Sequence, residues 1–154
     1  MVFSDELVSV ILPRTSDGTL ELTILRRRSD WQLSSLAQIC SLSIPQALLT
    51  VEHLYIQVRF PSHNWEDDIE SRQWLELLHL FAAVKSLYID DYFAPRIVPA
   101  LQELVGERVI EVLPYLQNLF LNKTPQTRPV QEGVGQFIAA RQLAGHSIAV
   151  SRWG

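Results

Sequence analysis

The chain has 154 residues, of which 47% are hydrophobic and 19% are charged, and its formal net charge is −4. This length and apolar content can bury one sizeable core, so we expect a single folded domain rather than a disordered chain. The acidic balance argues against nucleic acid as the main partner, because affinity for phosphate backbones depends on clustered Lys and Arg.

Three local features bear on the partners and the compartment of the protein. Arg26 to Arg28 form the one basic run, which is either a solvated turn or a binding patch, and we favour the turn. Cys40 is the only cysteine, so it cannot form an internal disulfide and a reducing compartment fits. Asp5 and Glu6 interrupt any signal peptide, and the apolar runs are too short to span a membrane. We therefore expect an intracellular protein of the cytoplasm or the nucleus, with no membrane partner.

The first predicted elements are two strands, Leu7–Leu12 and Thr19–Leu25, which are rich in β-branched residues. Asp17 and Gly18 between them are a turn signal, so this region predicts an antiparallel β-hairpin that caps the N-terminus. A helix is expected next, with Ser29 or Asp30 at its start, and Pro45 ends it.

The middle of the chain predicts strands at Val51–Phe60 and Ser86–Asp90, with a helix at Ile69–Val84 between them. A polar loop enters this helix, and its carboxylates, Glu66 to Asp68, have two interpretations. They either stabilise the positive end of the helix dipole or, with His63, hold a metal ion. We favour the first interpretation, because the loop lacks any standard spacing of metal ligands.

The C-terminal third continues the alternation. A helical region is expected from Pro95 to Leu113, interrupted at Gly106, which we interpret as a C-terminal cap. A strand follows at Asn118–Leu121. A loop rich in proline and glycine then leads to a last helix, Val134–Leu143, and to a strand at Ser147–Arg152.

One six-residue pattern recurs along this alternation. It reads "VEHLYI" at residues 51–56 and returns as "TLELTI", "VKSLYI", "LQNLFL" and "GHSIAV". Aligned on the fourth position, the copies are 32, 33, 32 and 29 residues apart and superpose Leu22, Leu54, Leu87, Leu119 and Ile148. A period near thirty residues predicts a stacked array. We expect one domain, 1–154, with a cap at 1–18 and repeats that start near residues 19, 51, 84, 116 and 145.

The helical crossovers favour parallel neighbouring strands. The predicted fold class is therefore α/β, a solenoid with parallel strands on the concave side and helices on the convex side. Because alternate side chains of a strand point to opposite faces, one set should face the helices and form the core. These predicted core residues are Leu54, Ile56, Leu87, Ile89, Leu119, Leu121, Ile148 and Val150.

The residues that alternate with this core predict a second face. Tyr55, Tyr88 and Phe120 should form a continuous aromatic row, because neighbouring strands lie about 4.8 Å apart, and we expect Thr23 and Ala149 to flank it. Two alternatives remain open: the rings only stabilise the sheet, or the loop that carries Trp65 folds over them. The predicted partner-binding residues are Tyr55, Gln57, Arg59, Tyr88, Asp90, Phe120 and Asn122.

The residues that catalysis would need are scattered. His53, His63, His79 and His146 follow no metal-binding or catalytic spacing, and Cys40 has no histidine close in sequence. The sequence also lacks a serine nucleophile elbow and a complete dinucleotide-binding glycine loop. We therefore expect no catalytic residues, no cofactor and no metal.

The strand pattern L-x-x-L-x-L with helical crossovers resembles leucine-rich repeats of the long, ribonuclease-inhibitor-like kind. The runs "SDWQLSSLAQIC", "FAPRIVPALQELVGERVIEVLPYLQNLFL" and "QFIAARQLAGHSIAVS" further resemble the C-terminal repeat region of fungal, chiefly basidiomycete, F-box-like proteins. This resemblance covers Ser29 to Trp153. It implies a protein-interaction module that holds the substrate of a cullin ubiquitin ligase, with a protein partner on the concave face.

This chain departs from the family pattern at its start, because we find no F-box module of short helices ahead of the repeats. Two other interpretations remain beside the ligase adaptor. One is a degenerate or purely structural repeat domain without a ligand of its own. The other, placed third, is an enzyme whose active site is assembled from residues distant in the sequence.

Overall fold

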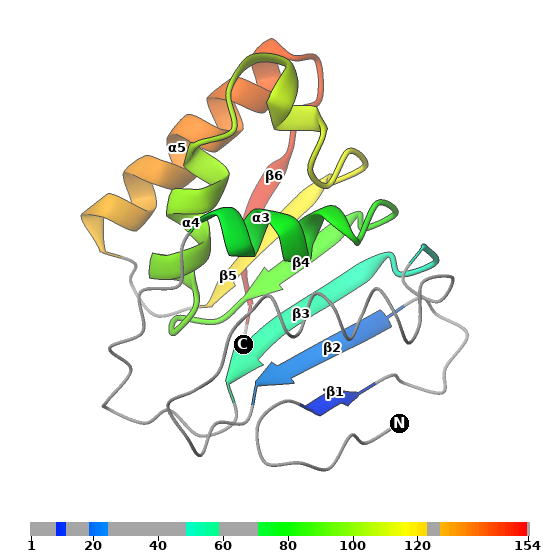
Figure 1. The fold of residues 1–154 in the computed structure, drawn as a ribbon. Helices are drawn as coiled ribbons and strands as arrows, with labels where there is room; N and C mark the ends of the chain where they lie inside the picture. Colours follow the sequence, from blue (N-terminus) through cyan, green and yellow to red (C-terminus); the bar gives the residue numbers. More distant parts are fainter. Residues whose placement is uncertain (1–8, 12–18, 25–48, 59–70, 123–126, 154) are drawn as a thin grey trace.

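The computed structural model describes residues 9–11, 19–24, 49–58, 71–122 and 127–153. These residues form an α/β structure in which helices cover one face of a single sheet (Figure 1). The strands are β1 (Ser9–Ile11), β2 (Thr19–Ile24), β3 (His53–Val58), β4 (Ser86–Ile89), β5 (Asn118–Asn122) and β6 (Ala149–Trp153). The helices are α3 (Ser71–His79), α4 (Ala94–Gln102), the 3-10 helix η1 (Gly106–Ile110) and α5 (Arg128–Leu143).

The strands lie in sequence order across the sheet, from β1 to β6. Strands β2 to β6 pair in parallel, as the crossover lengths predicted, and β1 pairs with β2 in the antiparallel sense. The segment that would close the predicted N-terminal hairpin, 12–18, lies outside the described residues, as does the helix predicted between Ser29 and Pro45. The hairpin and that helix therefore stay predictions.

The pairing register differs from the sequence alignment at both ends of the sheet. Leu54 pairs with Leu20 rather than Leu22, and Leu119 pairs with Val150 rather than Ile148. At the C-terminal end, Gly145 makes a left-handed turn with φ +80° after α5, and β6 begins at Ala149. Because side chains alternate with a period of two, a shift of two residues keeps each side chain on its predicted face.

The core lies between the sheet and the helices. Leu54, Leu87 and Leu119 are completely buried, and the other predicted core residues are buried as well, with the exception of Val150. The prediction for Val150 was wrong, because its side chain is 39% exposed. Val150 lies on β6, which pairs with a described strand on one side only.

Two predicted helix boundaries were wrong. The helix predicted to reach Val84 ends at His79, and the buried side chains of Phe81 and Val84 belong to the turn that follows. Their burial extended the apolar periodicity beyond the helix. The helix predicted from Val134 begins at Arg128. Its first turn contains a proline, which fits there because N–H groups of the first turn have no partner within the helix.

The glycines of the last two crossovers have different functions in the fold. Gly133 lies inside α5, where a Cβ atom would stand 2.6 Å from Val98 Cγ1 of α4, so its absence lets the two helices approach. Gly106 does not cap α4 as predicted. This helix ends at Gln102 with Glu103 as its cap, and Gly106 starts η1 with φ +59°. The predicted interruption is present, at a position three residues earlier.

Candidate functional site

Three aromatic rings stack on the face of the sheet that lies opposite the helices. The ring centroids of Tyr55 and Tyr88 are 4.0 Å apart and the planes meet at 10°, whereas Tyr88 and Phe120 are 4.4 Å apart at 4°. The parallel register causes this arrangement, because it pairs Tyr55 with Tyr88 and Tyr88 with Phe120. The predicted alignment of the three rings is therefore confirmed, and we call them the aromatic ladder.

A fourth ring, from Trp153 on β6, lies across the ladder. Its indole makes edge contacts with Tyr55 at 5.8 Å and 75° and with Tyr88 at 5.6 Å and 84°. The indole N–H also donates a hydrogen bond to the backbone carbonyl of Ile89 at 3.3 Å. Sequence reasoning missed Trp153 because it ended the last strand at Arg152. The signal available was the alternation of β6, which puts Ser151 and Trp153 on one face.

Two rows of polar residues run beside the ladder, since residues two positions apart on a strand share a face. The row before the rings contains His53, Ser86 and Asn118, and the row after them contains Gln57, Asp90 and Asn122. All six are half-buried except Ser86, which is buried. The face therefore offers an apolar stripe between two stripes that can form hydrogen bonds.

Five of the seven predicted partner-binding residues lie on strands of this face, Asp90 directly follows the end of β4, and Arg59 lies outside the described residues. The residues beside the two outer rings differ from the prediction. Glu21 pairs with Tyr55 and Ser151 pairs with Phe120, in place of Thr23 and Ala149. The cause is the two-residue shift in register described above.

Asp90 also has a structural task. Its carboxylate oxygen Oδ1 accepts a hydrogen bond from the backbone N–H of Phe93 at 2.9 Å, and its carbonyl accepts one from Ala94 at 3.0 Å. Both bonds satisfy N–H groups at the start of α4, which have no partner within the helix. The Asp90 side chain is thereby fixed in place at the edge of the ladder.

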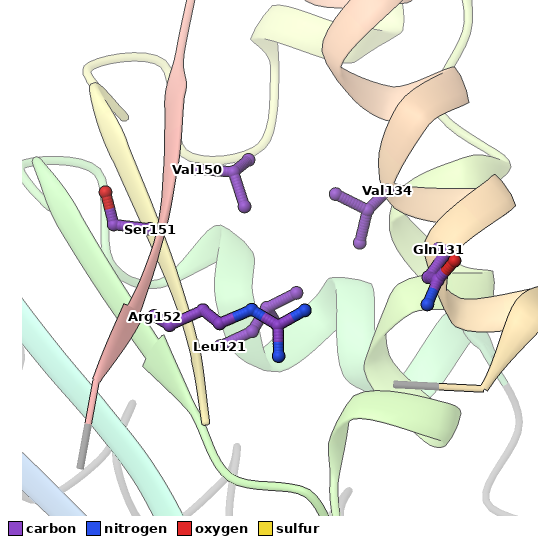
Figure 2. Close-up of a pocket in the computed structure, with 6 residues that line it drawn as sticks. All are labelled: Leu121, Gln131, Val134, Val150, Ser151 and Arg152. Atoms are coloured by element: carbon purple, nitrogen blue, oxygen red, sulfur yellow. The ribbon is translucent and has the colours of Figure 1, made fainter. Parts of the chain in front are cut away.

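A small cavity of about 200 Å³ opens on the opposite, helix-covered side, between β6 and α5. Figure 2 shows Val150 and Val134 pointing toward each other across it, with Arg152 and Gln131 beside them and Ser151 pointing away. The lining is mostly apolar, and Arg152 is its one charged residue. This cavity explains the exposure of Val150 and can accept an apolar group, but it brings together no reactive side chains.

Among the residues whose burial the structure describes, Arg141 of α5 is the one buried charged side chain. Its five N–H groups all donate to backbone carbonyls, those of Val109, Leu113, Pro114, Leu116 and His146, at distances from 3.0 to 3.4 Å. Burial lowers the pKa of the guanidinium, because desolvation disfavours the charged form. An arginine nevertheless stays charged in proteins.

The Arg141 contacts have a structural purpose. They hold the segment from η1 to β5, including Leu113, which has an unfavourable positive φ of 53°. A left-handed leucine costs free energy on its own, and the bond to its carbonyl helps to fix it. Sequence reasoning did not single out Arg141, because nothing in a run such as "AARQLAG" distinguishes a buried arginine from an exposed one.

The described residues contain no group of three or more His, Cys, Asp or Glu side chains placed to hold a metal ion. His53, His79 and His146 lie on three separate elements, and His63, the Glu66–Asp68 carboxylates and Cys40 lie outside the described part. None of the described helices is long and apolar enough to cross a membrane. Comparisons with family models, curated proteins and solved structures found no match to this chain.

Proposed function

We propose that this chain is a leucine-rich-repeat-like solenoid that binds a protein partner on the face of the aromatic ladder. We further propose that it is the substrate-recognition repeat region of an F-box-like ubiquitin-ligase adaptor that acts in the cytoplasm or the nucleus. The observation that carries the binding proposal is the stack of Tyr55, Tyr88 and Phe120 on a face that no described helix covers.

The solenoid part is supported by a connection that repeats from strand to strand. The carbonyl of Glu52 accepts hydrogen bonds from the N–H groups of Lys85 and Ser86, at 2.8 and 3.0 Å. One unit later the carbonyl of Lys85 accepts from Gln117 and Asn118 at the same two distances. Successive units that join through the same backbone atoms are the mark of an array in which each repeat contacts its neighbours.

The binding part is supported by the composition and the rigidity of the face. Tyrosine and tryptophan are enriched among the residues that dominate protein interfaces. The ladder rings are fixed by their mutual contacts before any partner arrives, so binding would order few side chains and lose little conformational entropy. The polar rows on both sides supply donors and acceptors that can orient a polypeptide partner.

The stacking also favours a second candidate, a structural repeat domain without a ligand. Each pair of stacked rings stabilises the strands that carry it, and Trp153 already contacts two of the three rings. In this second candidate the ladder is a means of holding the sheet together, and the removal of a ring would affect only folding. The two candidates therefore differ in what one ring substitution does to binding.

The experiment compares two tyrosine substitutions. Tyr88→Ala removes the middle ring of the ladder, whereas Tyr115→Ala removes a ring that is 66% exposed and outside the ladder. The wild type and both variants are immobilised at a temperature at which all three are folded, and partners are captured from a basidiomycete extract. We expect a defined partner that the wild type and Tyr115→Ala retain and that Tyr88→Ala loses.

Equal capture by all three proteins would contradict a binding role for the ladder and leave the structural candidate. The ligase part has a separate test, the sequence of the full-length transcript. An in-frame F-box upstream of Met1 would support it, and a transcript that starts translation at Met1 without one would contradict it for this product.

A further inference from the structure

One position on the ladder face is filled by a side chain of the chain itself. Trp153 contacts the rings of Tyr55 and Tyr88 edge to face, and its N–H donates to the carbonyl of Ile89. These are the two kinds of contact by which a pocket holds an indole ligand: apolar ring contacts and one directional hydrogen bond. The ladder together with the Ile89 carbonyl is therefore a site with the right shape and chemistry for an indole.

The strand that carries this indole lies at the edge of the described sheet and buries little of its own surface. Strand β6 pairs only with β5 in the described sheet, and its residues from Ala149 to Arg152 are all exposed. By contrast, the residues of β4 are buried or half-buried. Segments with little buried apolar surface open at low free-energy cost. The end of β6 can therefore leave the ladder while the core beneath α3 and α4 stays intact.

From these two observations we infer that Trp153 is an internal stand-in for a tryptophan side chain of the partner, which displaces it from the ladder. The inference rests on the proposed function and specifies the ligand: a polypeptide segment whose tryptophan makes edge-to-face contacts with Tyr55 and Tyr88 and donates its N–H to the carbonyl of Ile89. A phenylalanine can make the ring contacts but not the hydrogen bond. A partner's tryptophan must therefore bind the ladder strongly enough to displace Trp153.

In the test, the full chain with the substitution Trp153→Ala is titrated with the probe N-acetyl-L-tryptophanamide, and binding is followed by NMR. We expect saturable binding with chemical-shift changes at Tyr55, Tyr88 and the residues beside Ile89. The wild type should bind the probe at least about ten-fold more weakly, because its own indole competes at a high effective concentration. N-acetyl-L-phenylalaninamide should bind the variant about three- to ten-fold more weakly, since it lacks the N–H donor.

Val150→Ala is the matched control, because it lies on the same strand with its side chain on the helix-covered side. It should bind the probe as weakly as the wild type. Equal probe binding by the wild type and Trp153→Ala, or no saturable binding to Trp153→Ala, would overturn the inference. So would the unfolding of Trp153→Ala, since displacement requires that the fold survive without the indole.

These outcomes are distinguishable from a failure of the proposed function. If Tyr88→Ala abolishes partner capture while Trp153→Ala binds no probe, the inference falls and the binding face stands. If the probe binds but Tyr88→Ala leaves capture intact, the indole site exists and the partner binds elsewhere.

Discussion

Leu87 and Tyr88 are neighbours in β4, and their side chains lie on opposite faces of the same sheet. Leu87 is fully buried beneath the helices, whereas Tyr88 is half-buried between two stacked rings. The helix-covered face consists of aliphatic side chains in a closed core. The ladder face consists of rings and hydrogen-bonding side chains that no described helix covers.

The difference separates two tasks along one backbone. Burial of aliphatic side chains against α3, α4 and α5 supplies the hydrophobic stabilisation of the fold. The ladder face adds less to this stabilisation, because its rings keep part of their surface in water. The same partial exposure lets the ladder face present a rigid aromatic surface to a partner. Substitutions on the helix side should change stability first, and substitutions on the ladder side should change binding first.

The largest expected effect is on the helix side, at Arg141. Arg141→Leu would remove the guanidinium donors of five backbone carbonyls, three of which lie in buried contacts. We expect a loss of about 3–5 kcal/mol in the free energy of unfolding, measured by urea denaturation. Arg141→Lys is the matched control and should lose less, about 1–3 kcal/mol, because an ammonium group retains three donors. Wild-type stability in Arg141→Leu would show that the carbonyl contacts do not stabilise the fold.

The core itself gives the next effect. Leu87→Ala should lower the free energy of unfolding by about 2–5 kcal/mol, the range for a buried leucine truncated in a packed core. The control is Val150→Ala, which removes a 39% exposed side chain beside the open cavity, and we expect it to lose less than about 1 kcal/mol. Similar midpoints for the two variants in chemical denaturation would contradict the placement of the core.

The helix layer can be tested with two glycines of α5. Gly133→Ala places a Cβ 2.6 Å from Val98 Cγ1, and we expect the crowding to lower stability by about 1–3 kcal/mol. Gly135→Ala meets no atom within 4 Å, so it should raise stability by about 0.5–1 kcal/mol through helix propensity. The stability of both variants is measured by thermal melting. Stabilisation by both substitutions would show that α4 and α5 do not approach closely at Gly133.

On the ladder we expect a smaller loss of stability than in the core. Tyr88→Ala removes a ring that stacks on two others and contacts Trp153, and aromatic pairs contribute about 0.5–1.5 kcal/mol each. The three contacts together give about 1.5–4.5 kcal/mol, and we expect a loss near the lower end of this range because the ring is only half-buried. Urea denaturation in parallel with Leu87→Ala measures it. A loss as large as that of Leu87→Ala would assign the ladder to the structure of the sheet and weaken the separation of the two faces.

The strand pattern of the sequence was sufficient to predict the parallel sheet, most of its core and the alignment of the three ladder rings. All three follow from the alternation of side chains along strands that repeat at a near-constant spacing. The register at the two ends was not predictable in this way. The paired positions Leu20, Leu54, Leu87, Leu119 and Val150 are spaced by 34, 33, 32 and 31 residues, so the spacing between paired strand positions shortens along the chain.

The features that sequence reasoning missed depend on contacts between distant residues. The place of Trp153 over Tyr55 depends on two strands that lie between β6 and β3 in the sheet. The burial of Arg141 depends on carbonyls about thirty residues earlier in the chain. Likewise, Gly133 was predicted to lie in a loop, whereas it lies inside α5 at the close approach to α4. The contacts of Arg141 and Gly133 leave no periodic signal in the sequence, whereas the alternation of β6 indicates the face of Trp153 but not the residues that it contacts.

The most direct test of the separation between the two faces is hydroxyl-radical footprinting of the free protein and of its complex with the partner captured by the wild type. The account predicts that Tyr55, Tyr88 and Phe120 lose reactivity in the complex, while the exposed rim residues Tyr115 and Leu143, which are away from the ladder, keep theirs. Protection of Tyr115 or Leu143 with an unchanged ladder would contradict it and place the binding surface away from the ladder.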